Sequence, residues 1–190
     1  IKVSSSDDSS VGTVQNLLGN YRVEDLVPVD YTCIATIANE KTNCLYWFVT
    51  NSQTFKHAIL QYNIIEEQST IVLLDTDNSV LKFTENIITG INIIDDLLFW
   101  TDNNSEPKKI NIKNCIQGSK EANPIRTSID IAAHTKLMVD GVDKGFIKEE
   151  HITVIRKNPK IAPSIEINKP TELNTPRLFE QVFPRFSFRY

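Results

Sequence analysis

The run TDNNSEP at residues 101–107 offers the first possible chemistry, because carboxylate and amide oxygens crowd into it. Its candidate ligands are Asp102, Asn103, Asn104 and Glu106. Hard cations such as Ca²⁺ take oxygen ligands of this kind, but an EF-hand loop needs Gly at its sixth position and Glu at its twelfth. Counted from Asp102, those positions hold Pro107 and Lys113. Asp, Asn and Ser also favour turns by bonding their own backbone, so the run predicts a hairpin turn and not a metal site.

Histidine is the other residue type that could carry acid–base or metal chemistry. The three histidines, His57, His134 and His151, are far apart, and each lies among residues typical of strands. No G-x-S-x-G motif or Gly-rich phosphate loop accompanies them. The adjacent acids Asp95 and Asp96 are placed as a turn between two apolar strands and not as a pair flanking a cleft. We therefore expect exposed or hydrogen-bonded strand histidines, and we predict no catalytic, metal-binding or cofactor-binding residue, no cofactor and no enzymatic activity.

Cysteine usage and hydropathy indicate where the chain folds. Cys33, Cys44 and Cys115 are odd in number, widely spaced and form no C-x-x-C pair, so we expect reduced, buried thiols. Folding in a cytoplasm fits that expectation. No apolar run approaches the roughly 20 residues that span a bilayer, and no signal peptide is visible. The chain starts Ile-Lys-Val, and we expect a processed product or the ordered part of a longer protein.

Charge is distributed unevenly along the chain. Residues 1–106 carry 5 Lys and Arg against 15 Asp and Glu, a net charge of −10, whereas residues 107–190 carry 15 against 9, a net charge of +6. This polarity suits head-to-tail packing between copies, or contact between a basic face and an acidic partner. Two surfaces that are merely solvated differently would give the same pattern. The total of −4 gives no general argument for binding nucleic acid or an anionic membrane.

The pattern of apolar runs is that of an all-β protein. Ile, Val, Thr, Phe and Tyr come in short runs bounded by Asn, Asp and Ser, at the spacing of sandwiches, barrels and propellers. No segment shows convincing 3.6-residue periodicity over ten residues, although residues 10–20 could hold one helical turn. The predicted strands are 31–38, 44–50, 57–63, 69–75, 80–83, 87–94, 97–101, 108–112, 126–131, 136–140, 151–156, 163–167 and 180–189.

A repeat within the chain sets the expected architecture. Residues 34–63 and 87–114 share an apolar strand, a polar turn, a Leu-aromatic-Trp strand, an Asn/Ser turn and a further strand. The repeated Trp47 and Trp100 lie 53 positions apart by their numbers, near the roughly 40–50-residue period of propeller blades. Each unit would be a three- or four-stranded antiparallel meander with its Trp buried against a neighbouring blade. Residues 64–83 would supply an outer strand and the crossover.

The pattern changes after residue 113. Residues 113–127 resemble a loop, and the dipeptides Asp140-Gly141 and Lys144-Gly145 predict hairpin turns. A proline-rich connector follows, and the chain ends in FPRFSFRY, in which aromatic and basic residues alternate. Its apolar side chains, Phe183, Phe186 and Phe188, need a partner surface. This favours a strand shared with another domain or chain over a stacking platform for single-stranded nucleic acid.

The predicted fold is therefore a partial β-propeller of about two antiparallel blades, followed by a small β region and an extended C-terminal strand. Its parts are an N-terminal extended segment (1–30), two blades (31–113), a loop with a connecting strand (114–133), a β-hairpin region (134–170), and an extended connector with a C-terminal strand that pairs with another domain or chain (171–190). A closed propeller takes roughly four to eight blades, so the rest of the ring must come from a longer precursor or from other copies.

Several longer motifs point to a family. They are VGTVQNLLGN (11–20), CLYWFVTN (44–51), ITGINIIDDLLFWTDNNSEPKKINI (88–112), HTKLMVDGVDKGFIKEEHITVIRKNPKIAPSIE (134–166) and FPRFSFRY (183–190). The segment LFWTDNNSEPKKINI resembles the YWTD-type propeller signature. Together the motifs resemble the propeller-bearing tail proteins, of muzzle or nozzle type, of crAss-like podoviruses and related tailed phages. The resemblance covers most of the chain, and in that family the match falls within a much longer polypeptide.

This resemblance implies a virion structural protein that forms a ring around the DNA exit channel. It would act in tail assembly, DNA gating or ejection, or host contact, after folding in the cytoplasm of the bacterial host. Its partners would be other copies, other tail proteins and the remainder of its own precursor, with DNA nearby but not demonstrably bound. The alternative is a carbohydrate-binding propeller module of a tail appendage, which needs Trp47 and Trp100 exposed in a groove. A propeller glycosidase or lyase would need clustered acids at the propeller mouth.

Overall fold

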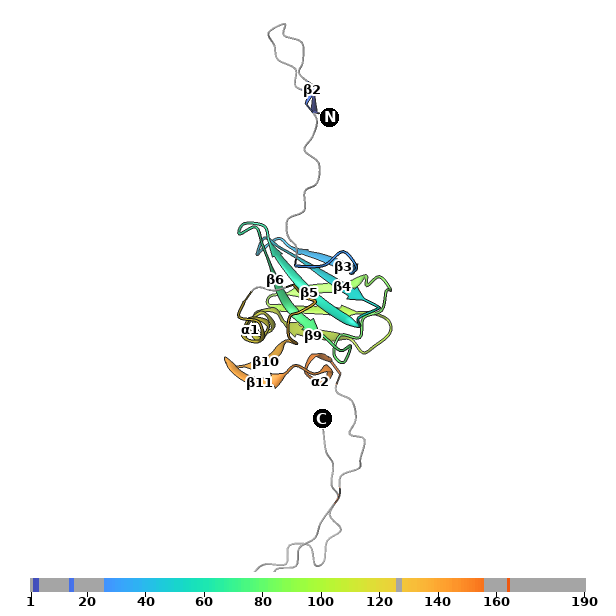
Figure 1. The fold of residues 1–190 in the computed structure, drawn as a ribbon, viewed down its shortest axis with the longest axis vertical. Helices are drawn as coiled ribbons and strands as arrows, with labels where there is room; N and C mark the ends of the chain where they lie inside the picture. Colours follow the sequence, from blue (N-terminus) through green and yellow to red (C-terminus); the bar gives the residue numbers. More distant parts are fainter. Residues whose placement is uncertain (1, 4–13, 16–25, 126–127, 156–163, 165–190) are drawn as a thin grey trace, which may run out of the picture.

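The computed structural model describes residues 2–3, 14–15, 26–125, 128–155 and 164 (Figure 1). The predicted C-terminal strand at 180–189, the connector that precedes it and all but one residue of the predicted strand 163–167 lie outside the described residues. Within the predicted helical turn at 10–20, the described residues are instead extended. They form β2 (Val14–Gln15), which pairs antiparallel with β1 (Lys2–Val3).

The first sheet is an antiparallel meander of four consecutive strands, and it confirms the predicted strands at 31–38, 44–50, 57–63 and 69–75. Asn residues shape its turns, because they tolerate left-handed backbone and bond nearby N–H groups. Asn43 has φ 51°, and the Asn63 side chain accepts the N–H groups of Ile65 and Glu66 in the β5–β6 turn. The strands are β3 (Thr32–Asn39), β4 (Cys44–Asn51), β5 (Lys56–Asn63) and β6 (Gln68–Asp75).

The second sheet is a shorter antiparallel meander of three strands, β7 (Gly90–Ile94), β8 (Leu97–Thr101) and β9 (Lys108–Asn111). Ile94 pairs with Leu97 across the two-residue turn Asp95-Asp96, with Asp95 at φ 53°, so the predicted hairpin turn is confirmed. The second hairpin, from β8 to β9, contains the run at 101–107.

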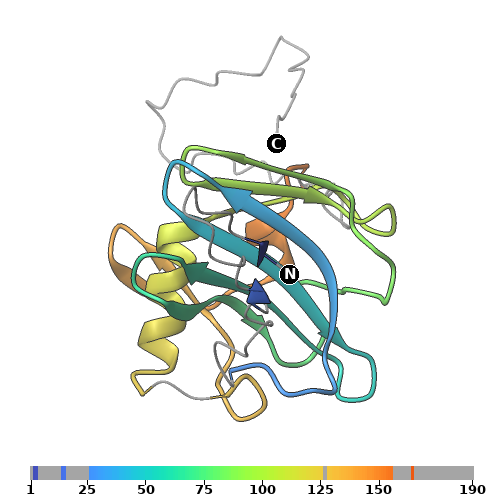
Figure 2. The same ribbon diagram turned by 90° about the horizontal axis from the view of Figure 1, so that it is seen from above.

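The two sheets pack face to face around one core (Figure 2). Alternation along each strand turns Phe48 of β4 and Trp100 of β8 toward each other, and their rings meet edge to face with centroids 5.6 Å apart. The first strands of the sheets also approach each other, since the Ile88 N–H donates to the Ile34 carbonyl at 2.9 Å. The sheets therefore stack with their leading strands adjacent.

A second, smaller core covers the other face of the first sheet. Val49, Leu60 and Leu74 point away from the second sheet and pack with Leu26 and Ile129. The Ile129 N–H donates to the Leu26 carbonyl at 3.1 Å, which joins the segments before and after the sheets. The first sheet is thus buried over part of both faces.

The segment predicted as a loop at 113–127 is largely a helix, α1 (Ile112–Ala122), which lies beside β6 (Figure 1). The Asn111 side chain caps it by accepting the Asn114 N–H at 3.0 Å. Its buried face consists of Ile112, Cys115, Gly118 and Ser119, at helical spacing. The sequence prediction was wrong here because Ser, Gly and Cys, which fill this face, are weak periodic signals among polar neighbours.

Three predicted strands are wrong, and the outcome for the β-hairpin region is mixed. Residues 80–83 are bends and an irregular segment. Residues 129–131 of the predicted strand 126–131 are turns, and the predicted strand 151–156 begins as a short helix, α2 (Glu149–Ile152). The Asp140-Gly141 turn is confirmed: it joins β10 (Lys136–Val139) to β11 (Val142–Phe146), and both its residues have positive φ. The predicted turn at Lys144-Gly145 instead lies inside β11 at a register shift.

The described chain is therefore mostly β, built from antiparallel sheets of consecutive strands, with two helices. No sheet closes on itself among the described residues. None of the helices in this part of the chain is long and apolar enough to cross a membrane.

Gly118 tests how tightly α1 packs on β10. A Cβ there would lie 1.9 Å from the Lys136 carbonyl oxygen. Replacing an ordinary helical Gly with Ala gains about 0.5–1 kcal/mol, whereas overpacking costs about 1–3 kcal/mol. We expect Gly118→Ala to lower the free energy of unfolding by about 1–2 kcal/mol in urea denaturation. The exposed Gln117→Ala is the matched control and should change little; an unchanged or raised stability of Gly118→Ala would contradict this packing.

Candidate functional site

The run at 101–107 forms a turn that Asp102 organises with its own carboxylate. The Asp102 Oδ1 accepts the N–H groups of Asn104 at 3.0 Å and Ser105 at 2.8 Å, and Oδ2 accepts the Ser105 hydroxyl at 2.9 Å. Burial alone would raise the pKa of Asp102, but the hydrogen bonds from Ser105 and Asn104 outweigh it and lower the pKa. The predicted hairpin turn is confirmed, and these oxygens are already used by the turn.

A buried lysine lies against this turn. Lys108 is 1% exposed, and its ammonium donates to the Leu81 carbonyl at 2.9 Å and to the Ser105 hydroxyl. Its Nζ lies 3.7 Å from the Asp102 Oδ2. Burial lowers the pKa of Lys108, and the Asp102 charge opposes that shift. Sequence analysis missed Lys108, although alternation along β9 places it on the same face as Ile110.

His57 lies in β5, fully buried and hydrogen-bonded through both ring nitrogens. The Asn78 Oδ1 lies 2.9 Å from Nε2 and can only accept, so Nε2 carries the proton. Nδ1 then accepts the Thr50 hydroxyl at 2.9 Å. This order of hydroxyl, imidazole and amide is that of a nucleophile triad, but Thr50 is 2% exposed and cannot reach a substrate. His57 is the hydrogen-bonded strand histidine that the sequence predicts.

The other two histidines are not in strands, contrary to expectation, and lie in separate networks. His151 is in α2, where its Nδ1 accepts the Lys148 N–H at 3.0 Å. His134 precedes β10, and its Nδ1 lies 3.9 Å from the buried Asp75 carboxylate. Asp77 completes a group of three side chains whose ligand atoms lie within 4.8 Å of one another. Sequence analysis had no signal for this group, because its members lie far apart in the chain.

The three cysteines are free thiols, but only two are buried as predicted. Cys33 is exposed on the first strand of the sheet. Cys115 lines a cavity of about 240 Å³ between α1 and β9 that also meets His151. Burial raises the pKa of Cys115 to about 12, so its thiol stays protonated at neutral pH and is a poor nucleophile.

The two repeated tryptophans point in the same direction through the stacked sheets. Trp100 lies on the face of β8 that packs against the first sheet and is 2% exposed. Trp47 lies on the face of β4 that points away from the second sheet and is half-buried. A sandwich with mirrored faces would turn both rings inward. Equivalent positions that face the same way are the arrangement of repeated units.

Each end of this stack presents apolar side chains. On the outer face of the second sheet, Ile94 is 55% exposed, and Leu97 and Phe99 are half-buried. On the outer face of the first sheet, Leu45 and Trp47 form a similar row. Trp100 is too buried to stack on a sugar, so only Trp47 remains for the carbohydrate-binding alternative.

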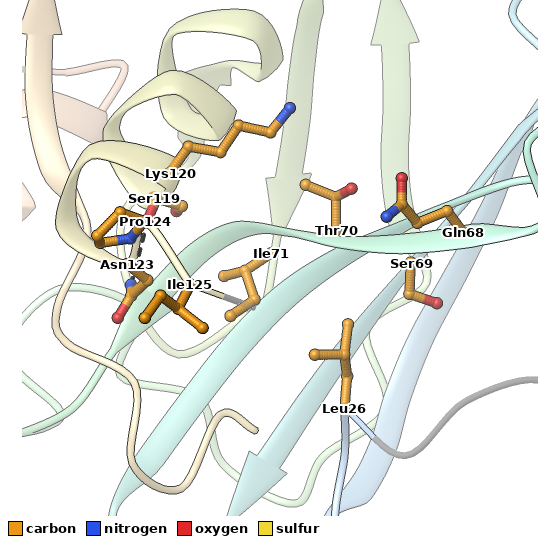
Figure 3. A pocket seen from close by; sticks show the side chains of 10 residues that line it. All are labelled: Leu26, Gln68, Ser69, Thr70, Ile71, Ser119, Lys120, Asn123, Pro124 and Ile125. Atoms are coloured by element: carbon orange, nitrogen blue, oxygen red, sulfur yellow. Dashed lines mark hydrogen bonds between the residues drawn. The ribbon is translucent and has the colours of Figure 1, made fainter. Parts of the chain in front are cut away.

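Figure 3 shows a groove of about 290 Å³ between β6 and the end of α1. Leu26, Ile71 and Ile125 lie around it, and Lys120 is the one titratable side chain on its wall. It therefore offers no pair of acid and base groups for catalysis.

Comparison with known protein families, with curated proteins and with solved structures finds no match to the chain.

The buried His57 predicts a pH dependence of stability. Burial lowers the pKa of His57, so the folded protein keeps a neutral ring while the unfolded chain takes up a proton near its ordinary pKa of about 6.5. The unfolded state binds more protons, and stability must fall as pH drops below about 6.5. We expect His57→Gln to flatten this slope by up to about 1.4 kcal/mol per pH unit in urea unfolding. Equal slopes for wild type and His57→Gln would refute the assignment.

Proposed function

We propose that this chain is a structural component of a bacteriophage tail, a ring-forming protein of muzzle or nozzle type around the DNA exit channel. It would act in assembly, in DNA gating or ejection, or in host contact. Its partners would be other copies, other tail proteins and the remainder of a longer precursor. Two meanders built on one repeat, and the motifs that resemble such tail proteins, support this proposal.

The observation that carries the proposal is the common direction of Trp47 and Trp100. If Trp100 is the wedge between the second blade and the first, then Trp47 is the wedge between the first blade and one before it. The adjacency of β3 and β7 fits two blades with their inner strands toward one axis. Further blades would then pack on two outer faces. One is formed by Leu45 and Trp47 on the first sheet, and the other by Ile94, Leu97 and Phe99 on the second.

The role that follows is mechanical. Antiparallel sheets with tightly packed cores transmit force with little deformation, because protein interiors are dense and weakly compressible. The acidic first half and the basic second half of the chain would help neighbouring units dock in register.

The native mass of the chain isolated from its natural source tests this function. We expect a large symmetric complex in native mass spectrometry, with peptide mapping that shows sequence continuing beyond the termini or a companion chain. Acrylamide quenching of Trp47 should also be weaker in the complex than in a dissociated sample, because the ring becomes covered. A stable 21.6 kDa monomer with natural ends at Ile1 and Tyr190 would contradict the proposal.

A surface variant tests the stacking face independently of the source. Ile94→Lys places a charge in the proposed interface, and a buried unpaired charge weakens association. We expect association at least roughly tenfold weaker by sedimentation velocity, which is about 1.4 kcal/mol. Ile65→Lys, at a 73% exposed turn position, is the control and should assemble normally. Equal association of both variants would argue against this face.

A further inference from the structure

Asp75, Asp77 and His134 come together where β6 ends. Asp75 is the last residue of β6, Asp77 lies in the loop that follows, and His134 precedes β10. One ligand atom from each lies within 4.8 Å of the others, and the Asp75 Oδ1 is 3.9 Å from the His134 Nδ1. The fold therefore joins a mixed carboxylate and imidazole set from two distant segments.

The His134 ring is held with a lone pair toward Asp75. Its Nε2 lies 3.1 Å from the Ile147 carbonyl, which can only accept, so Nε2 carries the proton. In the neutral ring Nδ1 is then an acceptor, and its partners in Thr76, the N–H at 3.4 Å and the hydroxyl at 3.5 Å, are both at long distance. Phe146 packs edge-on against the ring at 5.7 Å. Metal-ligating histidines are commonly oriented in this way, with the remote N–H donated to a backbone carbonyl.

Asp75 carries a buried charge that its hydrogen bonds satisfy unevenly. The carboxylate is fully buried. Oδ2 accepts short bonds from Val80 and Leu81, at 2.8 and 2.7 Å, whereas the N–H groups that reach Oδ1 are 3.2 and 3.3 Å away. Oδ1 is the oxygen that faces His134. Among the described residues, His134 is the one ion-pair partner of Asp75, and a neutral imidazole brings no charge. A buried carboxylate needs a counter-charge.

We propose that Asp75, Asp77 and His134 bind one divalent transition-metal ion of the zinc class. Imidazole nitrogen with carboxylate oxygen suits such ions better than Ca²⁺ or Mg²⁺, which take oxygen. At ligand distances of about 2.0–2.2 Å, two ligand atoms of a tetrahedral ion lie about 3.3–3.6 Å apart. The Asp75 and His134 atoms, which are 3.9 Å apart, would need to close by a few tenths of an ångström. The exposed Asp77 accepts the Ser79 N–H at 3.2 Å, and its side chain would rotate away from that bond to reach the ion. Water can complete the tetrahedron. The ion would fasten the β10–β11 hairpin to the end of β6.

This site departs from the sequence-based expectation of no metal ligand, and it does not depend on the tail function. A ring could assemble without metal, and a monomer could bind it. A failed metal titration would therefore leave the proposed tail function standing, and a monomeric native mass would leave the proposed metal site standing.

Zinc titration of the chelator-stripped full chain tests the proposal. At a free Zn²⁺ concentration about 100-fold above Kd, the unfolding equilibrium constant should fall about 100-fold, seen as a raised Tm. The ¹⁵N resonance of the His134 Nδ1 should shift with Zn²⁺. Asp77→Asn and His134→Gln should lose the effect and His151→Gln should keep it. Asp77 is exposed, so its variant should fold, whereas Asp75→Asn would also disturb the loop.

Three outcomes would overturn the proposal. The wild type could show neither binding nor stabilisation, or Asp77→Asn and His134→Gln could both retain wild-type affinity. The His134 Nδ1 could also respond to protons and not to Zn²⁺, in which case a proton on His134 supplies the counter-charge of Asp75.

Discussion

The crossover from β6 to β7 depends on two buried charges that bind the N–H and the carbonyl of one residue, Leu81. The Asp75 carboxylate accepts the Leu81 N–H at 2.7 Å, and the Lys108 ammonium donates to the Leu81 carbonyl at 2.9 Å. Asp75 ends the first sheet and Lys108 begins the last strand of the second. Charge-assisted hydrogen bonds of this kind are roughly twice as strong as neutral ones. Because Asp75 belongs to the first sheet and Lys108 to the second, their bonds to Leu81 hold the crossover against both sheets.

An aromatic cluster of Phe48, Phe83 and Trp100 shares one buried core with Leu81. Phe83 lies within the crossover, and its ring centroid is 5.6 Å from that of Phe48 and 6.4 Å from that of Trp100. The Trp100 Nε1 has no hydrogen-bond partner among the described residues, which costs about 1–3 kcal/mol. Burying an aromatic ring of roughly 150–250 Å² contributes about 4–6 kcal/mol at 25 cal/mol/Å². Packing therefore outweighs the missing hydrogen bond, and the ring stays inside.

The strands of the two sheets were predictable because local patterns determine them. Alternation and Asn- or Asp-rich turns defined seven of the strands well, including the hairpin at Asp95-Asp96. The helix α1 was not predictable in this way, because its buried face includes Ser119 and Cys115 and its start depends on the Asn111 cap. Asp102 could be assigned to a turn from its neighbours alone. The group Asp75, Asp77 and His134 could not be found, since only tertiary structure brings positions 75 and 134 together.

The meander topology has a consequence for the order in which the chain folds. Each strand of a sheet pairs with the next strand in sequence, so short loops close both sheets at small entropic cost. The Ser128 hydroxyl, in contrast, reaches the Leu26 carbonyl across 102 positions. Contacts of such long sequence separation are slow to form. The two sheets should therefore form early in refolding. The contact between Leu26 and Ile129 should form last and complete the second core over sheets that have already folded.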